Sequence, residues 1–289
     1  MRLLVPVIPP TFYAAGINYR EHVIEGARKR GVEPQFPPQA DAGYRANNAL
    51  IAQGETNVIP RDATKLVQYE GELVAVIGRT CHRVSKAEVL DYVLGYTIRN
   101  DVSERSWQAS DRTLWRAKNT DTFKPMGPWI TTGLDPDNLS VTIRLNGKEM
   151  YTYRVADAIF GVRAFISRMS QYLTLAPGDV LWMGSDGATE NMRDGDLVEI
   201  EVPGIGTLPN PVARERVARG SAERADAAEQ HIAQRPFAPP RLGRRRPAAQ
   251  SPSANSAMLT PYPANAAALS IGERARSMSP LAITATASG

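Results

Sequence analysis

Two glutamates stand close together ahead of a short apolar run. Glu70 and Glu72 flank Gly71, and the run 73–77 that follows is brief, rich in β-branched residues and closed by Gly78, which predicts a buried strand. Residues i and i+2 of a strand point to the same face, so the two carboxylates should lie side by side. Because burying unpaired carboxylates beside a core is expensive, we expect a positive charge between them.

A third carboxylate follows the next apolar segment. Residues 94–98 lead into Asn100 and Asp101, which places Asp101 at a predicted strand end. Three carboxylates with no nearby cysteine or histidine form a ligand set for a hard, octahedral cation such as Mg²⁺ or Mn²⁺, with waters or substrate oxygens completing it. The alternative is that the glutamates are exposed, or that they pair with Arg99 and Arg105.

An imidazole and a further carboxylate share one face of a predicted helix. His22 and Glu25 are three residues apart in the segment 18–31, where Asn18 is a suitable N-cap and Gly31 a suitable stop. A carboxylate beside an imidazole orients the ring and favours its protonated form, as a general base requires. The alternative is a surface pair of no consequence.

The composition is that of a soluble globular protein. Of the 289 residues, 43% are apolar and 22% are charged. We expect a cytoplasmic location, because no apolar run reaches the roughly 18–20 residues of a membrane span, the N-terminus does not resemble a secretory signal, and the single cysteine, Cys81, fits a reducing compartment.

The net charge of +4 is unevenly distributed. Residues 213–289 hold 11 Arg against 5 Asp and Glu, which leaves 23 of the 34 basic residues and 25 of the 30 acidic residues to the rest of the chain. The body therefore lacks the basic excess of a nucleic-acid-binding protein, and neither nucleic acid nor a membrane is an expected partner.

Three regions follow from composition and pattern. Residues 1–50 carry the His22–Glu25 helix and a loop at 34–48, rich in Pro, Gly and Asn, that is long enough to act as a flap. Residues 51–212 form the predicted core. Residues 213–289 are dominated by Ala, Arg, Pro and Ser and have little apolar periodicity, which predicts a mostly disordered tail.

Within the core, the pattern favours strands over helices. It predicts strands at 122–132, 180–183 and 197–202, and a hairpin at 141–153 around an Asn-Gly turn. Apolar residues at helical spacing predict an amphipathic helix over about 157–173, and the polar segment 103–118 is expected to be a helical connection.

These segments, taken in order, resemble the motifs of the fumarylacetoacetate hydrolase family. The resemblance covers about residues 12–212 and combines several motifs that are each weak alone. The segments that carry it are Gly16-x-Asn18-Tyr19-x-x-His22-x-x-Glu25, Tyr69-Glu70-Gly71-Glu72-Leu73, the run 95–103 with Asn100-Asp101, the run 117–129 with Ala117-Lys118, Leu175-x-Pro177-Gly178-Asp179-Val180, and the run 204–211.

The resemblance implies a mixed α/β, β-rich fold, a sandwich rolled around a metal site with a few peripheral helices, usually in a homodimer. It also implies a divalent-metal-dependent enzyme, with Mg²⁺ or Mn²⁺, that acts on a small-molecule 2-oxo or 1,3-dioxo carboxylic acid. His22, oriented by Glu25, would take a proton from water, and Lys118 would balance carboxylate charge. The implied residues are Glu70, Glu72 and Asp101 for the metal, His22, Glu25 and Lys118 for catalysis, and Arg105, Gln108 and Ser185 for substrate oxygens.

Departures from the family pattern leave the substrate open. Residues 183–186 are Met-Gly-Ser-Asp where the family commonly has Thr-Gly-Thr-Pro, Ser106 stands where Asp is usual, and Pro209 replaces a frequent Arg. Three hypotheses follow: a hydrolase that cleaves a C–C bond, the same site used as a 2-oxo-acid decarboxylase or hydroxydienedioate isomerase, and a non-catalytic binding protein that keeps the fold.

Overall fold

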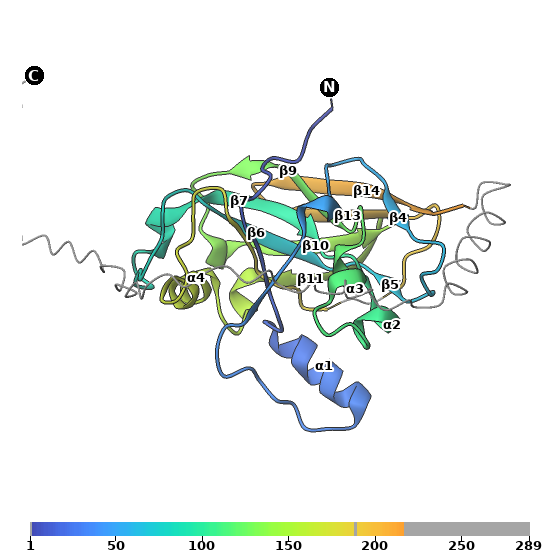
Figure 1. Cartoon of the computed structure of the whole chain (residues 1–289), viewed down its shortest axis with the longest axis horizontal. Coiled ribbons are helices and arrows are strands. Elements are labelled where there is room, and N and C mark those ends of the chain that lie inside the picture. The colour runs from blue at the N-terminus through green and yellow to red at the C-terminus, as the bar shows by residue number, and fades with distance from the viewer. Residues whose placement is uncertain (1, 188–189, 217–289) are drawn as a thin grey trace, which may run out of the picture. The chain divides into compact units, whose positions relative to one another are not determined.

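Two large β-sheets, one two-stranded sheet and four short α-helices form the part of the chain that the structure, a computed structural model, describes, residues 2–187 and 190–216 (Figure 1). The larger sheet has seven strands in the order β2-β1-β12-β6-β7-β9-β3. Their bounds are β1 Phe12–Ala15, β2 Ala42–Tyr44, β3 Leu50–Ile51, β6 Gly71–Ile77, β7 Val93–Asn100, β9 Lys124–Thr131 and β12 Val180–Trp182.

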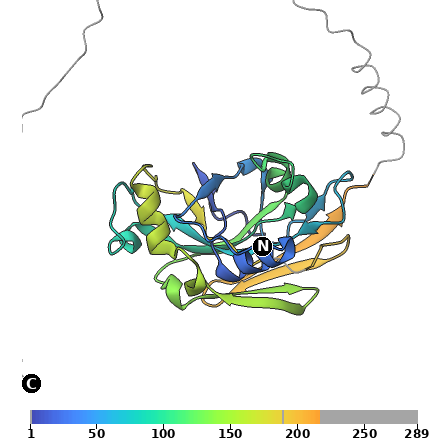
Figure 2. The ribbon, with the colours of Figure 1, turned by 90° about the horizontal axis from the view of Figure 1, so that it is seen from below.

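The second sheet has five strands in the order β11-β10-β13-β14-β4, and β5 pairs with β8. Their bounds are β4 Asn57–Ile59, β5 Val67–Gln68, β8 Ser103–Glu104, β10 Ser140–Leu145, β11 Lys148–Arg154, β13 Leu197–Val202 and β14 Gly206–Arg214. The helices are α1 Arg20–Arg30, α2 Arg105–Gln108, α3 Trp115–Asn119 and α4 Val162–Ser170. Figure 2 shows the green and orange strands of the second sheet along one side of the body. The β-rich class predicted from the sequence is confirmed.

The strand β6 separates two apolar clusters. Leu73, Ala75 and Ile77 point into the main core, which they share with residues of the second sheet. Val74 lies on the opposite face and packs with Trp182 and other residues of the first sheet. This alternation follows from the two-residue period of a strand, and it turns Glu72 away from the second sheet.

Gly71 lets the two sheets approach each other at the start of β6. A Cβ atom at this position would lie 2.7 Å from the side chain of Ile143 on β10 and 2.9 Å from that of Ile200 on β13. The residue between the two glutamates therefore has to be small, because its side faces the second sheet at close range.

The prediction that Asn18 caps α1 is wrong. The residue preceding α1 is Tyr19, whose side chain makes no capping hydrogen bond. Asn18 is buried, and its Nδ2 donates to the main-chain oxygens of Phe160 (3.1 Å) and Met183 (2.8 Å). Asn18 thus ties the start of α1 to two distant segments, which an N-cap would not do. Gly31 does end the helix, with a left-handed φ of 66°.

The other helical predictions are only partly met. The helix expected over 157–173 is the shorter α4, preceded by a 3₁₀ turn at Val155–Asp157. The connection 103–118 contains two short helices, α2 and α3, rather than one.

Strands extend across both boundaries of the division made from the sequence, and the division itself stays a prediction. The loop 34–48 includes β2, which pairs with β1, so residues 1–50 contribute strands to the larger sheet. β14 extends to Arg214, and the expected tail lies outside the described residues from 217 onward. None of the helices in the described ranges is long and apolar enough to cross a bilayer.

Candidate metal centre and active site

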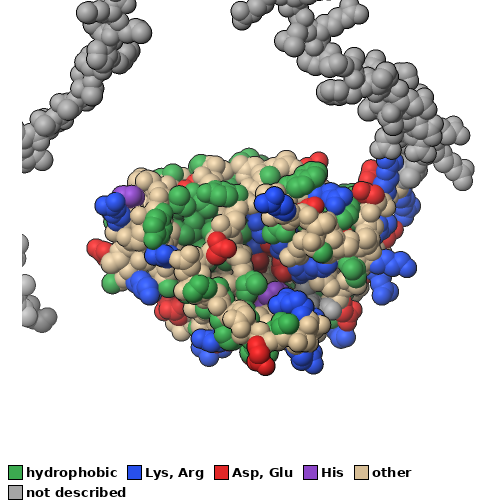
Figure 3. All heavy atoms as spheres, turned by 60° about the horizontal axis from the view of Figure 1, so that its bottom comes forward, with side chains coloured by type: hydrophobic (Ala, Val, Ile, Leu, Met, Phe, Trp, Pro, Cys, Tyr) green, Lys and Arg blue, Asp and Glu red, His purple; other side chains and the backbone are tan. Residues whose placement is uncertain are grey.

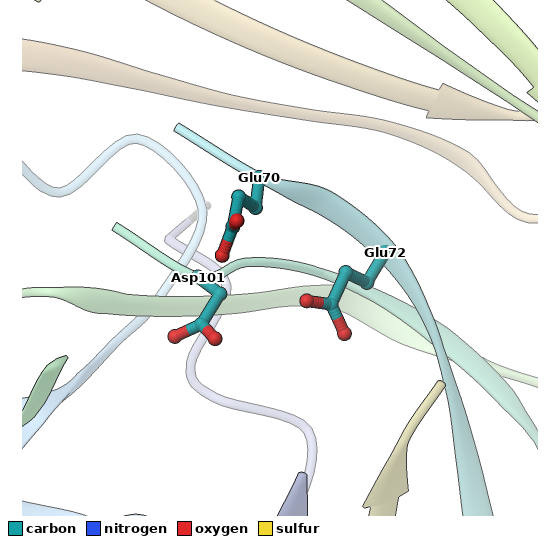
Figure 4. Close-up of side chains that lie close together, drawn as sticks. All are labelled: Glu70, Glu72 and Asp101. Atoms are coloured by element: carbon teal, nitrogen blue, oxygen red, sulfur yellow. The ribbon is translucent and has the colours of Figure 1, made fainter. Parts of the chain in front are cut away.

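The antiparallel register of β6 and β7 assembles a charged corner on the larger sheet. Gly71 is the partner of Asn100, and Glu72 is the partner of Arg99. Since side chains alternate between faces, Glu72 and Arg99 point to one face, and Asp101 follows Arg99 on that face. Figure 4 shows the carboxylates of Glu70, Glu72 and Asp101 turned toward one another, and one oxygen from each lies within 4.8 Å of the others.

Glu70 bridges two cations. It is buried, its Oε1 accepts from Arg105 Nη2 at 2.8 Å, and its Oε2 accepts from Lys118 Nζ at 2.7 Å. Burial alone would raise the pKa of this carboxyl, but the charges of Arg105 and Lys118 outweigh burial and lower the pKa below its ordinary value. Glu70 is therefore ionised at neutral pH.

Asp101 is the most heavily compensated carboxylate. Its Oδ2 accepts from Lys118 Nζ at 2.8 Å, and its Oδ1 lies 2.6 Å from Lys124 Nζ and 3.1 Å from Arg99 Nη1. Arg45 adds a longer contact of 3.4 Å to Oδ2. Burial works against ionisation, but these cations hold the pKa of Asp101 well below its ordinary value.

Glu72 has the weakest compensation of the three. Its Oε2 accepts a hydrogen bond from the main-chain N–H of Gly184 at 2.7 Å, and it forms an ion pair with Arg99. Burial raises the pKa of Glu72 despite Arg99, and the nearby charges of Asp101 and Glu70 raise it further. Additional positive charge at this point would therefore be stabilised.

The donor set fits a hard divalent cation. Three buried carboxylates from two adjacent strands supply oxygen ligands only. Oxygen ligands of this kind suit Mg²⁺ or Mn²⁺. The carboxylates also pair with Arg99 and Arg105, so the alternative partners raised by the sequence are present in the same corner.

A cavity of about 180 Å³ opens over this corner. All of the site residues predicted from the sequence except Glu25 line it, together with Arg45 and other residues of the N-terminal segment. In Figure 3 a histidine and acidic side chains lie inside a hollow on this face, beside basic side chains. The chain thus brings an imidazole and three carboxylates to one small space.

His22 lies on the α1 side of the cavity and is partly buried. Burial lowers the pKa of His22 below its ordinary value, and Arg105 and Lys118 oppose the upward effect of Glu70. The neutral imidazole, which can accept a proton, is therefore the favoured form at pH 7. The neighbouring carboxylates of Glu70 and Glu25 do favour the protonated form, as expected, but burial outweighs them.

Glu25 does not line the cavity. Its carboxylate forms an ion pair with Lys29 at 2.9 Å, and half of the Glu25 side chain is exposed. Among the contacts of the described residues there is no hydrogen bond between Glu25 and His22. The orientation of His22 by Glu25 stays a prediction.

Two further groups of polar side chains at the cavity are held by hydrogen bonds. Arg105 donates from Nε to Gln68 at 2.8 Å and from Nη1 to Gln108 at 2.9 Å. Ser185 Oγ donates to the main-chain oxygen of Gly187 at 3.0 Å and lies 3.2 Å from the hydroxyl of Tyr151. These bonds fix donors that face the cavity.

Three basic residues that contact the carboxylates were not predicted as site residues from the sequence. They are Arg45, Lys124 and Arg99. Arg99 had a usable signal, because it stands two residues before Asp101 in a predicted strand and so must share its face. Lys124 begins β9, which pairs with β7, and no local pattern marks that neighbour. Arg45 reaches the site from the loop after β2.

Comparisons with known proteins give consistent results. The family described as fumarylacetoacetate (FAA) hydrolase C-terminal matches residues 11–213. The crystal structure of 5-carboxymethyl-2-hydroxymuconate delta-isomerase from Mycobacterium smegmatis is 38% identical, has a TM-score of 0.67 and covers 74% of this chain and 80% of that chain. Maleylpyruvate hydrolase from Sphingobium sp. SYK-6, in complex with manganese (II) ion and pyruvate, is 26% identical, has a TM-score of 0.62 and covers 74% of each chain.

A relative from Salmonella dublin joins two activities in its name. The 4-hydroxyphenylacetate degradation bifunctional isomerase/decarboxylase is 35% identical over 212 residues, which are 72% of this chain and 48% of that protein. The three relatives thus have names that cover isomerisation, hydrolysis and decarboxylation.

Proposed function

The chain belongs to the fumarylacetoacetate hydrolase family, among its small single-core members, and from this membership we propose that it is a divalent-metal-dependent hydrolase that cleaves a C–C bond in a 2-oxo or 1,3-dioxo carboxylic acid. The observation that carries this proposal is the convergence of three buried carboxylates and a neutral imidazole on one cavity. A protein that only bound an anion would gain nothing from three carboxylates in its site.

Glu70, Glu72 and Asp101 would hold Mg²⁺ or Mn²⁺, and such an ion, when bound, stabilises the negative charge that develops on substrate oxygens. The manganese and pyruvate complex of the hydrolase from Sphingobium supports this choice of ion and of substrate class. His22 accepts a proton from a water molecule, and the resulting hydroxide adds to the carbonyl carbon at the bond to be cleaved. The bonding electron pair leaves with the other carbon fragment, which then takes up a proton.

The basic residues of the cavity position the substrate. Lys118 contacts both Glu70 and Asp101 and lines the cavity, so it balances their charge while presenting its ammonium group to an anionic substrate. Arg105, oriented by Gln108, and the hydroxyl of Ser185 are the groups that we assign to substrate oxygens. Glu25 is assigned to orient His22, which requires its side chain to leave Lys29.

A substrate panel with and without EDTA tests the proposal. We expect acylpyruvates or oxo-diacids to be cleaved in the presence of Mg²⁺ or Mn²⁺ and to persist after chelation. Incorporation of ¹⁸O from labelled water into the acid product identifies hydrolysis. The proposal of a metal-dependent enzyme is wrong if no compound of the panel turns over with either metal.

The second candidate is an isomerase or decarboxylase that uses the same residues. The relative from M. smegmatis favours isomerisation, because it is the more similar of the two solved structures and its name is that of an isomerase. Release of CO₂ without ¹⁸O incorporation would indicate decarboxylation. A shift in ultraviolet absorbance with no change in mass would indicate tautomerisation.

A non-catalytic binding protein is the least supported hypothesis. It predicts no turnover and an unaltered ligand affinity after His22→Ala.

We further propose a cytoplasmic homodimer. The family resemblance supports the dimer, and so do the exposed apolar side chains of Leu4, Ile8 and Trp129. Light scattering in solution tests the dimer, and the buried free thiol of Cys81 agrees with a reducing compartment.

A further inference from the structure

Arg99 is placed inside the candidate metal centre by strand register. It is the cross-strand partner of Glu72, its Nη1 lies 3.1 Å from Asp101 Oδ1, and it forms an ion pair with Glu72. One guanidinium therefore spans two of the three carboxylates that would bind a cation.

This guanidinium is fully enclosed. Arg99 is 0% exposed, and its Cζ lies 3.1 Å from the centroid of the Trp182 ring, which closes one side. Arg99 is not among the residues that line the cavity, so its guanidinium is covered by the protein. Lys118 and Arg105 do line the cavity and can change partners when a substrate enters.

Arg99 contacts the carboxylates of Glu72 and Asp101 through ion pairs. Lys124, the other fully enclosed cation, is different, because its Nζ donates to the main-chain oxygens of Val102 (3.0 Å) and Phe123 (3.1 Å). Arg99 thus acts mainly as a fixed positive charge beside the carboxylates.

The fixed positive charge of Arg99 repels a divalent ion that binds the same carboxylates. Three carboxylates already contact five cations, which are Arg45, Arg99, Arg105, Lys118 and Lys124. A divalent ion bound to Glu72 and Asp101 would share these ligands with Arg99 and repel it at short range in a buried site. The repulsion lowers the affinity for the ion, while the attraction keeps the carboxylates compensated when no ion is bound.

We propose that Arg99 is a positioning residue that serves as an internal counter-cation, competes with the divalent ion for Glu72 and Asp101, and so weakens metal binding. The inference rests on the proposed metal dependence of the site. It predicts a protein that is folded without metal and responds to changes in the free metal concentration.

Mn²⁺ binding to the full chain tests the role of Arg99. The signal of free Mn²⁺ in electron paramagnetic resonance gives the Kd for the wild type, Arg99→Met and Arg99→Lys. We expect Arg99→Met to bind Mn²⁺ about tenfold more tightly or better, and Arg99→Lys, which keeps the charge, to stay within about threefold of the wild type. Arg144→Met, on the outer face of the second sheet, is the matched control and should not change the Kd.

The outcomes separate the two proposals. Equal or weaker Mn²⁺ binding by Arg99→Met overturns the role of Arg99 and leaves the metal site intact. Absence of Mn²⁺ binding by both the wild type and Arg99→Met overturns the metal site itself. Folding of Arg99→Met only with Mn²⁺, seen in thermal melts with and without EDTA, supports the proposal, because the ion then replaces the missing charge. Arg99→Gln serves as the second variant if Arg99→Met folds in neither condition.

Discussion

Two ion pairs on the outer faces of the two sheets use the same residue types in opposite ways. On the larger sheet, Glu72 and Arg99 are direct cross-strand partners and both are buried. On the second sheet, Arg144 pairs with Glu201 across β10 and β13, and about a third of each side chain is exposed. An exposed ion pair adds little to the free energy of unfolding, because each charge is already well solvated by water. A buried ion pair has to offset the loss of hydration of both charges.

The two ion pairs differ in burial and in their distance from the candidate site. Around Arg144 and Glu201, solvent screens each group, so the pair is one of many acceptable surface arrangements. Around Glu72 and Arg99, each charge has to be compensated by another, and the outcome is a cluster of acids and bases beside a cavity. Substitutions in the two regions should therefore differ in kind as well as in size.

The largest effect is expected for Asp101→Asn. The change leaves Lys124 and Arg99 buried without their shared carboxylate oxygen, which costs about 3–5 kcal/mol of unfolding free energy. Mn²⁺ binding and activity should be lost as well. Urea denaturation and Mn²⁺ titration measure both, and the exposed Glu201→Gln is the control. Unchanged stability of Asp101→Asn would remove the contrast between the two sheets.

His22→Ala should lower kcat by about 10²–10⁴-fold without a comparable loss of stability. His22 borders the cavity but takes no part in the buried ion pairs, so its removal separates chemistry from folding. His82, which is exposed, is the matched control, and His82→Ala should keep full kcat. A wild-type rate for His22→Ala would contradict its role as the base.

The pH dependence of kcat/KM should show the lowered pKa of His22. Because burial makes the ring harder to protonate, the neutral base persists to a lower pH than that of a free histidine, and the acid limb should fall below pH 6.5. An acid limb above pH 6.5 would mean that the carboxylates, rather than burial, control the ring. The measurement requires rates from pH 4.5 to 8 in buffers of constant ionic strength.

A smaller change is expected for Glu25→Gln. The charge of Glu25 opposes the loss of a proton from His22, so its removal should move the acid limb to slightly lower pH. Lys29→Met removes the partner that Glu25 has in the structure and is the control. If Glu25 orients His22, Glu25→Gln should also lower kcat while Lys29→Met leaves it unchanged. Equal effects of the two changes would confine Glu25 to a surface pair.

The smallest effect is expected for Arg144→Met. Loss of an exposed partner should leave the melting temperature and activity without a measurable change. Thermal unfolding monitored by circular dichroism is sufficient. A clear loss of stability would show that burial is not the property that separates the two regions.

The strands around the site were predictable because their signals are local. The run 73–77 and the segment 94–98 correspond to β6 and β7, and two-residue spacing placed Glu70 and Glu72 on one face. The hairpin around Asn146 also follows from its turn residues. In each of these cases the neighbours that matter are close in sequence.

Predictions failed where the decisive partner lies far along the chain. Asn18 looked like an N-cap because its partners, the main-chain oxygens of Phe160 and Met183, cannot be inferred from the helix alone. Lys124 joined the site only through the pairing of β9 with β7. Arg45 likewise reaches Asp101 from a segment 56 residues away in sequence.

Gly71 separates the two candidate ligand glutamates, Glu70 and Glu72, and faces the second sheet at close range. Inserting or deleting one residue in β6 would turn either the two glutamates toward Ile143 and Ile200 or the core residues of β6 outward. The alternation of side chains along β6 therefore places both the carboxylates of the site and the residues of the core, and a shift of one set relative to the strand shifts the other. Evolution can silence this enzyme by exchanging side chains, but a change in the length of β6 would dismantle the protein together with its activity.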